Sequence, residues 1–72
     1  MQSLDPLTAY RTREQITKTE LAARLGISLG SVSNLSSGRQ FAGPDLCLRI
    51  AGLTGTPLRD VEAAYRYDRR VA

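Results

Sequence analysis

The chain has 72 residues, enough for one small domain near the lower size limit for a fold that depends on its own hydrophobic core. It contains no histidine and a single cysteine, Cys47, which excludes histidine-based metal sites, histidine acid–base catalysis and an internal disulfide. Ten Lys and Arg against seven Asp and Glu give a formal charge of +3, which permits an anionic partner without requiring one.

The N-terminal part of the chain predicts a helix that begins at a strong capping signal. Asp5 is a good N-cap residue, and Pro6 suits the first helical position. Leu7 and Tyr10 lie on one side of this helix, which we expect to end near residue 15, with Ile16 packing at its end.

Two short helices follow, joined by a glycine. Thr17 is the expected N-cap of the first, with Glu20 completing a capping box, and this helix runs to about Leu25. Gly26 ends it, and Ser28 caps a next helix from 29 to about 36. The apolar residues of the pair form a continuous inward stripe: Leu21, Ala22, Leu25, Ile27, Val32 and Leu35.

The C-terminal part predicts two more helices and no strand. Gly38 stops the third helix, residues 39–43 form a loop, Pro44 opens the fourth helix and Gly55 ends it. Apolar residues at helical spacing there are Leu46, Ile50, Ala51 and Leu53. Thr56 and Pro57 open the fifth helix, whose expected buried stripe is Leu58, Val61, Ala64 and Tyr65. The polar tail, 66–72, is expected to fray, and Cys47 is expected to be a small buried hydrophobe.

Residues 17–38 have the layout of a helix-turn-helix, in which the second helix is held outward to enter a DNA major groove. An ordered set of residues also resembles the Cro/C1-type (XRE-like) helix-turn-helix family over residues 6–65. Its members here are Leu7, Tyr10, Arg11, Ile16, Thr17, Glu20, Leu21, Ala22, Leu25, Gly26, Ile27, Ser28, Val32, Ser33, Leu35, Gly38, Pro44, Leu46, Ile50, Ala51, Leu53, Leu58 and Val61.

The resemblance implies a fold, a function and a partner. The fold would be an all-α, compact five-helix bundle of the lambda-repressor-like type: a single domain, 1–72, with a core at about 6–65 and the helix-turn-helix at 17–37. The function would be that of a cytoplasmic, nucleoid-associated bacterial or phage regulator of transcription. Such proteins bind double-stranded operator DNA and are usually homodimers and often repressors.

The resemblance also implies the DNA-binding residues. They are Thr17, Lys18, Ser28, Leu29, Gly30, Ser31, Ser33, Asn34, Ser37, Arg39 and Gln40. Lys18 would contact a phosphate, and Asn34 is the best base-reading candidate because its amide can bond adenine in bidentate fashion. Leu29 either packs on thymine methyls or makes an extra core or dimer contact.

The expected reading helix is unusual, because five serines and no Arg, Lys or Gln occur between 28 and 37. Gly30 either permits close approach to DNA or sits in the first turn, where glycine costs little. This helix therefore offers few side chains that can bond directly to bases, and we expect DNA shape and the loop residues Arg39 and Gln40 to share the specificity.

Three arginines have less specific expectations. In the resembled family an arginine at the place of Arg11 pairs with an acidic residue, but here that place holds Ser36. Arg11 either pairs with Asp45 or Asp60 or remains solvated, and we expect some pairing because a buried unpaired charge is costly. Arg13 and Arg24 are expected to be solvated helix charges.

Two features suggest partners other than DNA, namely the tyrosines near the end of the chain and the lack of long donor side chains in the expected reading helix. Tyr65 and Tyr67 are candidates for a homodimer surface in helix 5, because tyrosine is enriched at interfaces. RNA polymerase or a cognate toxin are further candidate partners. The alternative function is a protein-interaction module, such as the antitoxin of a toxin–antitoxin pair. No catalytic constellation, cofactor motif or metal-ligand set occurs in the sequence, so we expect no enzyme.

Overall fold

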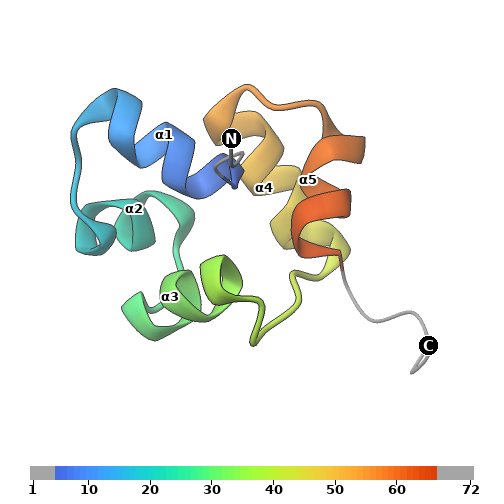
Figure 1. Cartoon of the computed structure of the whole chain (residues 1–72), viewed down its shortest axis with the longest axis horizontal. Coiled ribbons are helices and arrows are strands. Elements are labelled where there is room, and N and C mark those ends of the chain that lie inside the picture. The colour runs from blue at the N-terminus through green and yellow to red at the C-terminus, as the bar shows by residue number, and fades with distance from the viewer. Residues whose placement is uncertain (1–4, 67–72) are drawn as a thin grey trace.

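Five helices surround a single core in the computed structural model, which describes residues 5–66 (Figure 1). They are α1 (Pro6–Glu14), α2 (Lys18–Leu25), α3 (Leu29–Ser37), α4 (Pro44–Thr54) and α5 (Leu58–Tyr65). The described part contains no strand, so the predicted all-α class is confirmed. Helix α4 packs against α1, α2 and α5, while α3 packs mainly on α2. No helix in residues 5–66 has both the length and the apolar character needed to span a membrane.

The first three helices begin at the capping residues that the sequence predicted. The Asp5 carboxylate accepts from the Thr8 N–H at 3.3 Å, and the Thr17 hydroxyl accepts from the Glu20 N–H at 3.1 Å. The second half of the predicted capping box is not formed, because the Glu20 carboxylate lies 3.7 Å from Arg24, four residues along α2. One turn of helix brings those opposite charges together, and this competes with the bond back to the cap.

Left-handed residues end both helices of the predicted helix-turn-helix and the helix before them. Gly26 (φ 73°) ends α2 and Gly38 (φ 80°) ends α3, as predicted from glycine's freedom at positive φ. Helix α1 ends at Gln15, which is left-handed (φ 56°) although it is not a glycine. Its N–H still closes the helix by donating to the carbonyls of Arg11 and Thr12.

The core confirms the inward stripe of α2 and α3 and corrects that of α5. Thirteen hydrophobic residues are buried in one cluster: Leu7, Tyr10, Ile16, Leu21, Ala22, Leu25, Val32, Leu35, Ala42, Cys47, Ile50, Val61 and Tyr65. Leu58 and Ala64, predicted to be buried, are exposed. Only Val61 and Tyr65 of α5 reach the core, because an eight-residue helix that contacts the bundle mainly through α4 presents a narrow inward side.

Tyr65 joins the two ends of the described chain. Its hydroxyl accepts from the Leu7 N–H at 2.9 Å and donates to the Asp5 carboxylate. The Ser36 hydroxyl of α3 donates to the same carboxylate at 3.3 Å. We call this group, Asp5, Leu7, Ser36 and Tyr65, the Tyr65 clasp. Tyr65 is 2% exposed, so its predicted role in a dimer surface is wrong, and the other tyrosine of that prediction, Tyr67, lies outside the described residues.

Candidate nucleic-acid interface

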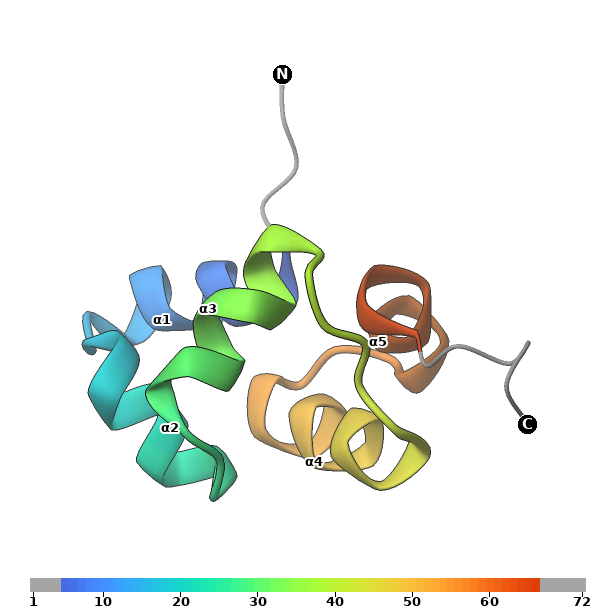
Figure 2. The same cartoon turned by 90° about the horizontal axis from the view of Figure 1, so that it is seen from below.

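Helices α2 and α3 and the turn between them form the predicted helix-turn-helix, and α3 lies at the surface nearest the viewer in Figure 2. The inner side of α3 is fixed by Val32 (1% exposed) and Leu35 (2%). Ile27 in the turn packs against the same core. Because α3 is held along this one side, its other side is presented outward as a rigid ridge.

The outer side of α3 carries the predicted base-reading residues at different degrees of exposure. Leu29 is 47% exposed, and Gly30 and Ser37 are exposed as well. Ser33 and Asn34 are half-buried. All five therefore have some surface open to a partner, and none belongs to the core cluster. The alternative that Leu29 makes an extra core contact is wrong, whereas its alternative role in a dimer contact stays a prediction.

Some serine hydroxyls of α3 are already engaged. The Ser28 hydroxyl accepts from the Ser31 N–H at 3.1 Å and donates to the Ser31 hydroxyl at 3.0 Å. The Ser37 hydroxyl donates to the Asn34 carbonyl at 3.2 Å. These contacts serve the ends of the helix, because the first N–H groups and last carbonyls lack helical partners. They leave Ser33 and Asn34 as the polar side chains of α3 without such a structural bond among the described residues.

The loop after α3 is held in place by backbone bonds on both sides. The N–H groups of Arg39 and Gln40 donate to the Asn34 carbonyl at 2.9 and 3.3 Å, and the Ala42 N–H donates to the Tyr65 carbonyl at 2.7 Å. Arg39 is exposed and Gln40 half-buried. The predicted reading loop is thus a fixed continuation of α3. It also projects Phe41, which is 54% exposed and which the sequence reasoning did not single out.

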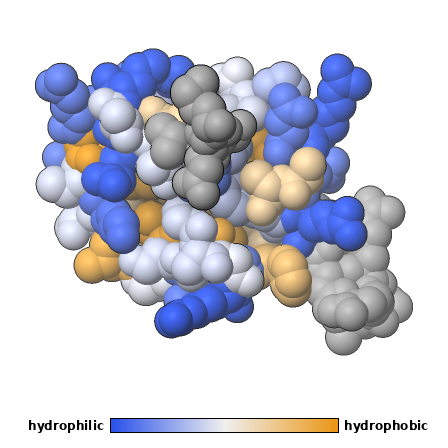
Figure 3. Space-filling view, viewed as in Figure 1, coloured by the Kyte–Doolittle hydropathy of each residue, from blue (hydrophilic) through white to orange (hydrophobic). Residues whose placement is uncertain are grey.

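The charges that could meet a phosphate backbone lie beside α3 and not on it. Between Ser28 and Gly38 the chain has no ionisable side chain, and much of the surface over this helix in Figure 3 is pale, the colour of residues of intermediate hydropathy. Lys18, at the first position of α2, is exposed, as are Thr17 before it and Arg39 beyond α3. Positive charge therefore brackets a neutral reading helix, which suits phosphate contacts that position the helix without specifying sequence.

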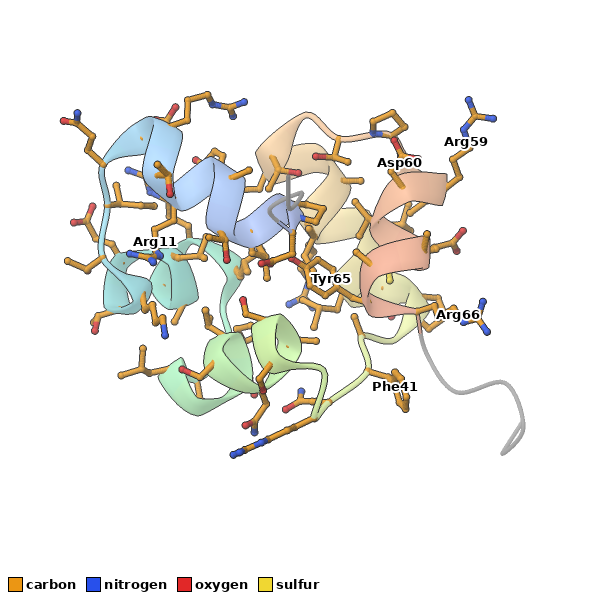
Figure 4. All side chains as sticks on the ribbon, in the orientation of Figure 1. Arg11, Phe41, Arg59, Asp60, Tyr65 and Arg66 are labelled. Carbon is orange, nitrogen blue, oxygen red and sulfur yellow. The ribbon has the colours of Figure 1, made fainter. Side chains whose placement is uncertain are left out.

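The expectation for Arg11 needs correction. In residues 5–66 Arg11 has no carboxylate within 4.0 Å, so its expected pairing with Asp45 or Asp60 is wrong. Figure 4 shows why for Asp60, which lies on α5 at the opposite side of the molecule. Ser36, at the family's acidic place, instead donates to Asp5. The long-range network thus uses Asp5 to hold α3.

Two further arginines hold the scaffold of the site. Arg24 was expected to be a solvated charge, and Arg49 was not singled out from the sequence. The Arg24 guanidinium donates to the Tyr10 hydroxyl at 2.8 Å and lies within 4.0 Å of Glu14. The Arg49 guanidinium, from α4, donates to the Leu25 carbonyl at 3.3 Å. That carbonyl belongs to the C-terminal turn of α2, where a cation is favourable. Arg13 fits its prediction better, since its side chain is 61% exposed.

An outward helix held by a capped partner helix, with cations on either side, defines the helix-turn-helix class of DNA-binding proteins. A helix-turn-helix family model matches residues 7–61. The chain belongs to the Cro/C1-type (XRE-like) helix-turn-helix family of DNA-binding regulators, as the sequence predicted. Comparison with curated proteins and with solved structures gives no match.

Proposed function

We propose that this protein is a sequence-specific regulator of transcription that binds a pseudo-palindromic operator in double-stranded DNA as a homodimer and represses by covering a promoter. The observation that carries the proposal is the outer side of α3, whose side chains are exposed or half-buried while Val32 and Leu35 of the inner side are buried in the core. Binding to DNA would place the protein with the nucleoid in the cytoplasm.

In this proposal Asn34 is the main polar reader. Its amide is free of structural bonds among the described residues, and an amide can both donate to and accept from adenine in the major groove. Lys18 and Arg39, both exposed, contact phosphates on either side of α3. Gln40 and Ser33 add polar contacts, and DNA shape supplies discrimination where α3 has no donor.

A homodimer follows from the symmetry of such operators, since one α3 covers one half-site and a second half-site lies one helical turn away. The interface cannot use the Tyr65 side chain, which is buried within one protomer. Among residues 5–66, Phe41 is an exposed aromatic side chain at that end of the molecule, where Figure 4 shows it pointing away from the core near Arg66. Aromatic and arginine side chains are enriched at interfaces, so this region replaces Tyr65 as the interface candidate.

The test is selection of bound duplexes from a random library, followed by titration of the selected duplex and a scrambled duplex at several salt concentrations. We expect an enriched sequence with two half-sites, and affinity that falls with salt because bound Lys and Arg release counterions. Lys18→Ala should weaken both duplexes alike and reduce the salt slope by about 1 per protomer. Arg59→Ala, on α5, is the matched control with an exposed cation outside the proposed surface.

One alternative is favoured by the neutral reading helix, namely a protein-interaction module such as an antitoxin. Without an ionisable side chain between 28 and 38, α3 makes no charge-assisted bond to a base. If the library returns no enriched sequence and binding shows no salt dependence, the regulator proposal is wrong and this alternative takes its place.

A further inference from the structure

Leu29 is the apolar side chain of the reading helix that the core does not use. It is 47% exposed and stands at the first position of α3, directly after the Ser28 cap. Its neighbour Gly30 has no side chain, and apart from the adjacent residues and the backbone of α3 itself, the Ser28 hydroxyl oxygen at 4.0 Å is the nearest atom to a Cβ built there. The Leu29 side chain therefore has open space beside it on the outer side of α3.

The polar groups nearest to Leu29 in sequence are occupied. The hydroxyls of Ser28 and Ser31 bond to each other, and Ser28 also caps the helix through the Ser31 N–H. The start of α3 thus offers a base pair an exposed hydrocarbon side chain beside two hydroxyls that already bond within the helix cap. In the major groove the hydrocarbon feature is the 5-methyl group of thymine, which cytosine lacks.

We infer that Leu29 determines specificity by packing against a thymine 5-methyl group in each half-site of the operator. The inference rests on the proposed DNA-binding function and names part of its ligand. Asn34 then reads one base pair by hydrogen bonds, and Leu29 reads another by apolar contact, about one and a half helical turns apart. The operator half-site accordingly contains a thymine at the position facing the start of α3.

The experiment uses the selected operator with thymines replaced one at a time by deoxyuridine, which removes the methyl group and leaves base pairing intact. For the wild-type protein, replacement of the single thymine that faces Leu29 in one half-site should weaken binding by about fourfold, the factor equivalent to burial of one methyl-sized group at ~0.8 kcal/mol. In Leu29→Ala the same replacement should change the affinity by much less. Leu29→Asn, which keeps the length and the branched shape but not the apolar tip, should also lose the methyl dependence.

Leu48→Ala is the matched control, since Leu48 is a leucine of similar exposure (56%) on α4. It should keep the full response to deoxyuridine, and thermal unfolding should show that the Leu29 variants are folded. The inference is overturned if the selected half-site contains no thymine, if deoxyuridine is neutral for the wild type, or if Leu29→Ala retains the response. Loss of dimerisation in Leu29→Ala with an unchanged response to deoxyuridine would assign Leu29 to the dimer contact instead. None of these results contradicts the regulator proposal, which fails only if no selective, salt-dependent binding occurs.

Discussion

The two sides of α3 differ in exposure and in the kinds of side chain they carry. The inner side is made of Val32 and Leu35, each at most 2% exposed, and it matches the family pattern. The outer side has serines, a glycine, Asn34 and an exposed leucine, and it lacks the charged donors that often read bases. The inner side thus determines where the helix lies, and the outer side determines what it can contact. Substitutions on the two sides should therefore separate folding from recognition.

The largest effect is expected from the inner side. Leu35→Ala removes a side chain that is 2% exposed and leaves a cavity, which typically costs 2 to 5 kcal/mol of unfolding free energy. A domain of 72 residues has little stability in reserve, so we expect extensive unfolding at 25 °C and loss of DNA binding together. Urea unfolding followed by circular dichroism measures this. A folded Leu35→Ala protein with normal stability would contradict the assignment of the inner side.

The residue next to it should behave in the opposite way. Asn34→Ala changes a half-buried residue outside the core, so the unfolding free energy should change by no more than about 0.5 kcal/mol. Binding should lose about 1 to 3 kcal/mol of discrimination at one base pair, because a bidentate contact is removed. Titration of the selected operator and its single-base variants at one fixed salt concentration measures both affinity and specificity. Equal weakening on every variant would assign Asn34 to phosphate contact and not to base reading.

The sequence predicted the local features of the fold better than the contacts between distant residues. Helix bounds were predicted to within one residue, because caps such as Thr17 and stops such as Gly26 act on backbone groups three or four positions away. The Tyr65 clasp was missed because its bonds join residues up to 60 positions apart. Ser31 and Ser37 were predicted to contact DNA, yet their hydroxyls bond within the chain, because a hydroxyl can bond to a helix end or to a base equally well. Sequence alone does not show which partner is nearer.

The Tyr65 clasp should make stability depend on acid pH. Burial acts to raise the pKa of Asp5, but hydrogen bonds from Thr8, Tyr65 and Ser36 together outweigh it and hold the pKa below its usual 3.8. A carboxylate with a lowered pKa in the folded state contributes stability above about pH 4, and this contribution is lost as the pH falls through the folded-state value. Asp5→Asn should therefore be less stable than the wild type at pH 7, and the difference should shrink toward pH 2.

Urea unfolding of the two proteins at both pH values tests this expectation, because subtraction cancels the titration of the other carboxylates. Asparagine also caps helices well, so the α1 cap itself is retained in the variant. A difference that stays constant with pH would show that the loss comes from packing and not from the Asp5 charge. The Tyr65 clasp also contacts α3 through Ser36. The Asp5→Asn variant should therefore bind the operator more weakly at pH 7 in proportion to its loss of stability, while its preference among base pairs stays that of the wild type.

The smallest effects on stability and binding are expected when two helical glycines are replaced, one on the proposed reading surface and one away from it. Gly30 lies in the first turn of α3 and Gly52 in the interior of α4, and a Cβ at either position meets no close neighbour. Alanine should therefore stabilise the fold at both, by up to about 1 kcal/mol at Gly52 and by less at Gly30. If α3 approaches the bases closely, Gly30→Ala alone should weaken operator binding, because the added methyl group occupies the space beside Leu29. Gly52→Ala should bind like the wild type. Full affinity in a stabilised Gly30→Ala would show instead that glycine is simply tolerated in a first turn, and that Leu29 meets the DNA without a close backbone approach.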